Sequence, residues 1–130
     1  MPHYHTVVWI DHRIAHVYGL GRSDTSDELV RSHGPHHIHH KAGTVGSGHE
    51  RDKPSYFREI AGHLAGAGSI LILGPAETKI ELKTFLDEQA SDVAAKVVGV
   101  EPLDQESEGR IIAFARKFFA ASDRLAPQGR

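Results

Sequence analysis

The sequence predicts an α/β fold built on a mixed five-stranded sheet, and two observations carry that prediction. Three short runs rich in β-branched residues, 6–10, 14–20 and 28–33, follow one another with no helical segment between them, which is typical of an antiparallel meander. Two aliphatic runs, 70–73 and 96–100, each follow an amphipathic segment, as parallel strands joined by helices do. The second run is expected to be a buried strand that Glu101-Pro102 breaks. The expected element order is βββαβαβα, with right-handed crossovers placing the last two strands parallel to each other.

The first three strands are expected to be joined by short polar turns. Residues 6–10 read Thr-Val-Val-Trp-Ile, and the Asp11-His12-Arg13 segment that follows allows a tight reversal. Residues 14–20 form the second strand, and a polar turn at 23–27 leads to the third. From 34 to 52 no periodicity survives. Because irregular loops of this length in compact domains are usually functional or disordered, we expect a mobile loop there.

Three helices are expected. The first begins at Lys53-Pro54-Ser55, and its apolar residues Phe57, Ile60, Ala61 and Leu64 recur at helical spacing. The second covers residues 76–90 or continues to 94, with Pro75 in its first turn. The third covers residues 110–121, with Ile111, Ala115 and Phe118 on one face. One domain is therefore expected over residues 1–121, followed by a flexible tail at 122–130.

The stretch at residues 69–79 organises the predicted sheet. Four consecutive aliphatic residues, 70–73, indicate a strand buried on both faces, and Gly74-Pro75 ends it. With the third, fourth and fifth strands parallel to the first, the exits at 11–13, 33–49, 74–79 and 101–104 should meet at one edge. Ligands of open α/β sheets usually bind at that edge.

Composition narrows the possible classes of function. The chain has 130 residues, no cysteine, eleven histidines and a formal net charge of −2. Disulfides and thiolate zinc sites are excluded, and no strongly basic nucleic-acid footprint is present. No apolar run reaches the roughly 20 residues of a membrane span, and the first residues do not resemble a signal peptide. A cytoplasmic protein without a membrane partner is the expectation.

Several motifs resemble one known group of proteins. Residues 56–61 (Tyr-Phe-Arg-Glu-Ile-Ala), the strand 70–73 and the turn 74–79 (Gly-Pro-Ala-Glu-Thr-Lys) resemble the middle domain of archaeal and eukaryotic class I peptide-chain release factors and of Pelota. Residues 8–12 (Val-Trp-Ile-Asp-His) resemble the start of small bacterial stand-alone translational machinery proteins. The resemblance implies a ribonuclease-H-like fold and a role in translation, with the ribosome or structured RNA as partner.

One departure from the release factors bears on activity. Those proteins carry a Gly-Gly-Gln tripeptide in the loop before the Phe-rich helix, whereas residues 41–49 contain glycines but no glutamine, and Gln89 is the first glutamine of the chain. Peptide release by that route is therefore not expected. Pelota-like proteins also lack the tripeptide in this domain. The resemblance therefore implies a non-enzymatic accessory protein of the translation apparatus, with no catalytic residue and no cofactor.

Basic and small residues near the predicted edge form a candidate RNA or anion site. Backbone N–H groups at a helix start bind phosphate, basic side chains add charge, and glycine allows close backbone approach. The candidates are Arg13, Lys41, Gly43, Arg51, Lys53, Thr78 and Lys79. The alternative is that Thr78 and Lys79 only cap and solvate their helix.

The histidine-rich loop is a candidate site for zinc or another divalent metal. Neutral imidazoles at close spacing bind such ions, and the candidate ligands are His36, His37, His39, His40, Asp11 and His12. The alternative is a solvated loop that titrates near neutral pH.

An alternative function is a metal-dependent hydrolase or nuclease that uses Asp11 and the histidine-rich loop. Ribonuclease-H-type catalysis needs several carboxylates around two metal ions, and the candidates are Asp11, Glu59, Glu77, Glu101 and Asp104. However, the fourth strand ends in Gly74-Pro75, where such enzymes place a carboxylate.

Overall fold

The computed structural model describes residues 5–21, 25–31, 45–104 and 106–125, and for Thr25, residues 45–52 and residues 123–125 it describes the backbone alone. Five strands and four helices lie in this part of the chain. None of these helices is long and apolar enough to cross a membrane. The elements are β1 (His5–Ile10), β2 (Ile14–Leu20), β3 (Thr25–Arg31), α2 (Val45–Leu64), β4 (Ser69–Gly74), α3 (Thr78–Gln89), α4 (Ser91–Ala94), β5 (Val97–Pro102) and α5 (Glu108–Leu125).

The five strands form one mixed sheet in the order β3-β2-β1-β4-β5. β1 and β3 are antiparallel to β2, whereas β4 is parallel to both β1 and β5. The predicted fold class, with three antiparallel strands followed by two parallel ones, is confirmed. As a result the carboxyl ends of β1, β3, β4 and β5 lie at one edge, where Ile10, Arg31, Gly74 and Pro102 end their strands.

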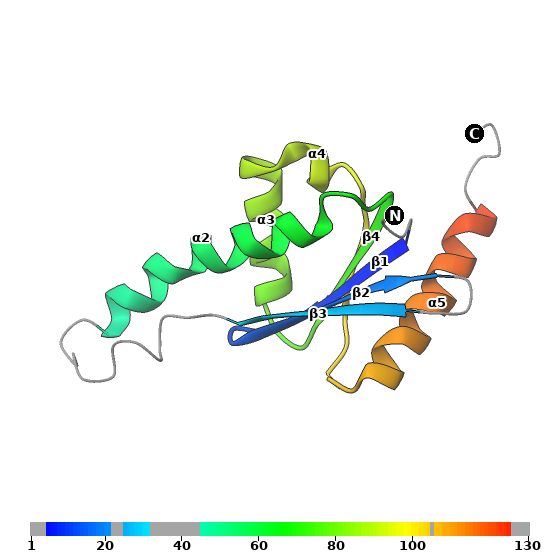
Figure 1. Ribbon diagram of the computed structural model, residues 1–130, viewed down its shortest axis with the longest axis horizontal. Helices are drawn as coiled ribbons and strands as arrows, with labels where there is room; N and C mark the ends of the chain where they lie inside the picture. The colour runs from blue at the N-terminus through cyan, green and yellow to red at the C-terminus, as the bar shows by residue number, and fades with distance from the viewer. Residues whose placement is uncertain (1–4, 22–24, 32–44, 105, 126–130) are drawn as a thin grey trace.

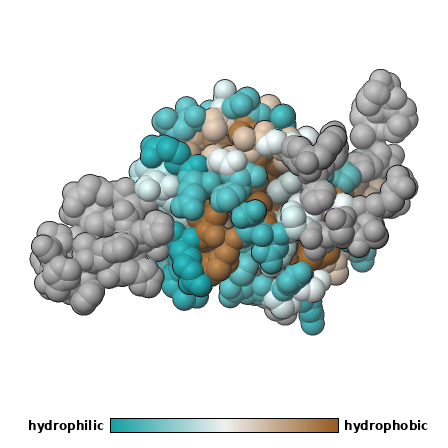
Figure 2. Space-filling view, viewed as in Figure 1, coloured by the Kyte–Doolittle hydropathy of each residue, from teal (hydrophilic) through white to brown (hydrophobic). Residues whose placement is uncertain are grey.

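Helices cover both faces of the sheet (Figure 1). The helices α2, α3 and α4 pack on one face against side chains such as Val8 and Ile10 of β1. The alternate residues of the same strand, Val7 and Trp9, pack on the other face against α5. Residues 70–73 of β4 are fully buried, as predicted for a strand covered on both faces. Figure 2 shows mostly hydrophilic side chains around an apolar patch near the middle of one face.

Two glycines permit close approach of neighbouring elements. A Cβ on Gly74 would lie 2.3 Å from the carbonyl oxygen of Ile10, so β4 and β1 approach each other more closely there than a side chain allows. A Cβ on Gly99 of β5 would lie 2.6 Å from Cζ of Phe118 on α5. The missing side chains let β4 approach β1 at Gly74 and let α5 approach the sheet at Gly99.

The sheet strands differ from the prediction mainly at their ends. β3 covers Thr25–Arg31 instead of 28–33, because its register with β2 pairs Thr25 with Leu20 and Arg31 with Ile14. β5 continues through Pro102, which was expected to break it. Because β5 is an edge strand, its residues are partly exposed, and the expected full burial of this strand is wrong.

The helices differ from the prediction more than the strands do. α2 begins at Val45 and contains Pro54, although Pro54 was expected in the first turn, so residues 45–52 are helical where an irregular loop was expected. Its first half extends away from the sheet (Figure 1), and its buried residues begin at Tyr56. α3 begins at Thr78, which leaves Pro75 outside the helix.

The last two helices differ at their ends and in their buried face. Ala90, with φ −148° and ψ 61°, separates α3 from α4. α5 runs to Leu125, so residues 122–125 of the expected tail are helical, while residues 126–130 lie outside the described residues. Its fully buried face carries Phe119 in place of the expected Phe118.

Candidate functional site at the carboxyl edge of the sheet

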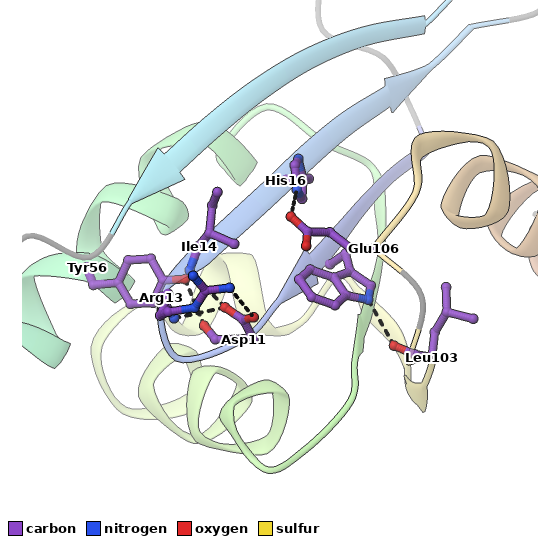
Figure 3. Close-up of polar contacts among 8 residues, drawn as sticks. Asp11, Arg13, Ile14, His16, Tyr56, Leu103 and Glu106 are labelled. Atoms are coloured by element: carbon purple, nitrogen blue, oxygen red, sulfur yellow. Dashed lines mark hydrogen bonds and ion pairs between the residues drawn. The ribbon is translucent and has the colours of Figure 1, made fainter.

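Asp11 holds the turn between β1 and β2. Its Oδ1 accepts hydrogen bonds from the backbone N–H groups of Arg13 (2.8 Å) and Ile14 (2.9 Å), and its own N–H donates to the carbonyl of Ile14 at 3.0 Å. Figure 3 shows the two hydrogen bonds that end on the Asp11 carboxylate. The predicted tight reversal is therefore stabilised by the aspartate itself, and one carboxylate oxygen is committed to the turn.

Tyr56 of α2 fixes this turn against the helix layer. Its hydroxyl donates to the Asp11 carbonyl at 2.9 Å, and the side chain is buried. Burial, and secondly the Asp11 carboxylate, raises the pKa of Tyr56. Arg13 lies 3.8 Å from Asp11 Oδ2, with 66% of its side chain exposed. An ion pair so exposed is weak, so the Arg13 guanidinium is available to other anions.

Lys53 and Glu81 connect α2 with α3 near this edge. Lys53 Nζ lies 2.9 Å from Glu81 Oε1, and both side chains are partly exposed. Lys53 is thus paired within the protein. Since exposed pairs contribute only about 0.2–1 kcal/mol, a phosphate group competes with Glu81 at small cost.

The start of α3 carries Thr78 and Lys79. Thr78 is buried, and the Lys79 ammonium donates to the carbonyl of Ala76 in the preceding turn. Glu77 is the N-cap residue, makes no side-chain capping bond and is exposed. Thr78 is consequently a packing residue, and the exposed Glu77 carboxylate opposes a phosphate at this helix end.

The structure brings together only part of the predicted site. Arg13 and Lys79 follow the neighbouring strands β1 and β4, and Lys53 lies on the helix that covers them. The backbone of Arg51 is helical, and its side chain lies outside the described residues. Lys41, Gly43, His36, His37, His39 and His40 also lie outside the described residues.

The described part of the predicted metal site consists of Asp11 and His12. His12 is exposed in the same turn as Asp11. Among residues 5–21, 25–31, 45–104 and 106–125, no three His, Asp or Glu side chains converge in a group that could hold a metal ion. The described carboxylates that were considered for a nuclease, such as Glu77 and Glu101, therefore form no metal-binding group.

Sequence reasoning missed a second polar cluster beside this edge. His16 Nε2 lies 2.8 Å from Glu106 Oε2 (Figure 3), and Trp9 Nε1 donates to the carbonyl of Leu103 at 2.9 Å. Both contacts join strands to the segment that leads into α5. The partners are about ninety residues apart in sequence, so no local pattern indicates them.

The fold is similar to part of the fold of Pelota proteins and of an archaeal translation termination factor, as comparison with solved structures shows. No protein family and no curated protein matches the sequence. Pelota from Archaeoglobus fulgidus is similar with a TM-score of 0.69 and 15% identity over 96% of this chain and 35% of that one. Pelota from Thermoplasma acidophilum has a TM-score of 0.63 and 20% identity, over 91% of this chain and 33% of that one. An archaeal translation termination factor, aRF1, has a TM-score of 0.56 and 9% identity, over 93% of this chain and 38% of that one.

These similarities confirm the predicted resemblance to Pelota and the release factors. Identities between 9% and 20% show a shared fold. The chain spans about a third of the length of the two Pelota proteins, which agrees with similarity to a single domain of each.

Proposed function

We propose that this protein is a non-enzymatic, cytoplasmic accessory protein of the translation apparatus that contacts the ribosome or structured RNA through the carboxyl edge of its sheet. The observation that carries this proposal is the match of 96% of the chain to the fold of a Pelota protein. Yeast Dom34, which has a TM-score of 0.57 and 12% identity, is a termination-like factor involved in RNA quality control. Because no Gly-Gly-Gln occurs in the chain, peptide release is not part of the proposal.

The described edge supports a small contact with RNA. Arg13, Lys53 and Lys79 place three positive charges on the β1–β2 turn, α2 and the start of α3. The two lysines have internal partners, Glu81 and the carbonyl of Ala76, that phosphate oxygens can replace. Exposed pairs exchange readily because they contribute little.

Nearby acidic groups limit the strength of that contact. Glu77 and Glu81 lie beside the three basic residues, and the chain carries a formal net charge of −2. Long-range attraction to RNA is therefore small, and binding depends on close contacts. Three phosphate contacts correspond to a slope of log affinity against log salt of roughly −2 to −3.

Co-sedimentation with purified ribosomes across a salt series tests the proposal. The variant with Arg13→Ala, Lys53→Ala and Lys79→Ala should lose most of the binding and most of the salt dependence. The matched control removes three exposed basic residues elsewhere, Lys96, Arg110 and Lys117, and should bind like the unaltered protein.

Two results contradict the proposal. The first is an absence of ribosome binding by the unaltered protein even at low salt. The second is an equal loss of binding in the edge variant and in the control, which would indicate general charge attraction with no role for the edge. Circular dichroism of each variant confirms that the fold is retained.

A further inference from the structure

A cleft of about 440 Å³ opens on the α5 side of the sheet, over β2 and β3. The ladder between these strands pairs Tyr18 with Asp27 and His16 with Leu29, so all four side chains lie on one face. α5 packs on the β1 and β2 part of this face, and the segment entering α5 forms the other wall. The cleft lies within the volume range of small-ligand sites.

Two aromatic rings line the floor of the cleft. The rings of His16 and Tyr18 are stacked, at an interplanar angle of 3° with centroids 5.9 Å apart. The Trp9 ring lies behind His16, tilted by 55° with its centroid 6.0 Å away. Leu29, 44% exposed, adds an apolar wall. Such a surface suits a flat or elongated group with apolar stems.

The rim of the cleft is acidic. Asp27 comes from β3, and Glu106 and Glu108 come from the segment that leads into α5. Among the described residues that line the cleft, the carboxylates face no lysine or arginine, and Glu106 is held by His16 at 2.8 Å. The charge complementary to this rim is positive.

The Tyr18 hydroxyl is an unused polar group in the cleft. Tyr18 is only 3% exposed, and its side chain lines the cleft. Its hydroxyl forms no hydrogen bond with any residue that the structure describes. Burial, followed by the charges of Glu108, Asp27 and Glu106, raises the pKa of Tyr18 to about 12. The phenol is therefore neutral at physiological pH, and its oxygen is free to accept a hydrogen bond from a ligand.

We propose that this cleft binds the guanidinium group of an arginine presented by a basic segment of a partner protein. The guanidinium lies beside the His16 and Tyr18 rings and donates to the rim carboxylates and to the Tyr18 oxygen. Its methylene stem lies against Leu29.

The hydrogen-bond acceptors of the cleft favour arginine over other cations. The carboxylates do not converge with His16 into a group of three that could hold a metal ion, among the residues that the structure describes. A guanidinium has five donors in a rigid plane and so bridges acceptors that are apart, whereas a lysine ammonium is a point charge that stacks less well. RNA is disfavoured because its phosphates meet the acidic rim.

Isothermal titration calorimetry with the full chain tests the proposal. The probe is a capped peptide of alternating arginine and glycine, and the same peptide with lysine in place of arginine is the comparison. Saturable binding of the arginine peptide is expected, at least fivefold tighter than that of the lysine peptide. Asp27→Asn with Glu108→Gln should weaken it tenfold or more. Tyr18→Phe should weaken it about three- to tenfold, through loss of one hydrogen bond.

The chain offers a closely matched control. Glu28 is the neighbour of Asp27 on β3, pairs with Val17 of the opposite face and is exposed. Glu28→Gln with Glu88→Gln therefore removes two charges away from the cleft and should change affinity less than twofold. The proposal is overturned by equal affinity for the two peptides, by equal loss in the control, by an unchanged affinity in Tyr18→Phe, or by displacement of the peptide by an RNA oligonucleotide.

Discussion

Replacing Gly74 by alanine should destabilise the protein strongly, because the new methyl group meets backbone. Its Cβ would lie 2.3 Å from the carbonyl oxygen of Ile10, whereas real Cβ contacts are essentially never under 3.0 Å. The strands must therefore separate by roughly 0.7 Å (3.0 minus 2.3) at this point. The obstacle belongs to the main chain of β1, and β4 is also held by the hydrogen bond from the Leu103 N–H to the Gly74 carbonyl. No side-chain rotation relieves the contact.

The expected cost follows from that geometry. Overpacking a core costs about 1–3 kcal/mol and occasionally more, and a backbone obstacle between two neighbouring strands belongs at the upper end, about 3 kcal/mol. With a urea m-value of about 1.5 kcal/mol/M, the unfolding midpoint should fall by about 2 M. Trp9, the single tryptophan of the chain, is buried and reports the transition by fluorescence.

Two further glycine substitutions test the reasoning. A Cβ on Gly62 of α2 would have nothing within 4 Å, so Gly62→Ala should stabilise the protein by about 0.5 kcal/mol through helix propensity. Gly99→Ala meets the tip of the Phe118 ring, which is a side chain able to shift, and should cost about 1 kcal/mol. A Gly74→Ala midpoint within about 0.3 M of the unaltered protein would refute the reasoning.

Two other predictions concern titration and surface charge. Burial raises the pKa of Tyr18 to about 12 and also raises that of Tyr56. The free energy of unfolding therefore keeps its full contribution from the two neutral phenols below about pH 10, and this contribution is lost as pH rises through the folded pKa values. In the folded protein at about pH 11, Tyr18→Phe and Tyr56→Phe should each leave the phenolate absorbance unchanged, and a drop in either variant would show an ordinary pKa. For Lys53 and Glu81, a double-mutant cycle with alanine should give a coupling energy below about 1 kcal/mol that shrinks with added salt, since both side chains are over 40% exposed. A larger coupling energy that does not depend on salt would contradict this prediction.

The order of elements and the directions of the strands could be predicted from the sequence because both depend on local patterns. Side-chain alternation, the four aliphatic residues at 70–73 and the helical spacing from Phe57 to Leu64 are properties of short segments. Each connecting helix returns the chain so that the next strand is parallel, and the right-handed crossover sets the face on which the helix lies. The meeting of strand exits at one edge, which holds Arg13 and Lys79, follows from those two facts.

Helix ends and side-chain partners were decided by the tertiary structure. Pro54 lies inside α2, and Ala90, a residue with high helix propensity, separates α3 from α4, because tertiary context overrides helix propensity. Lys53 looks like a free cation in the sequence and is paired with Glu81 of another helix.

The cleft over β2 and β3 shows the same limit most clearly. Its floor comes from His16 and Tyr18 of β2, and its rim comes from Asp27 of β3 and from Glu106 and Glu108. Alternation in the sequence indicates that His16 and Tyr18 share a face, and the short turn between β2 and β3 brings Asp27 beside them. Only the folding of the segment before α5 onto that face adds Glu106 and Glu108, because contacts between residues about ninety positions apart depend on the packing of the whole chain.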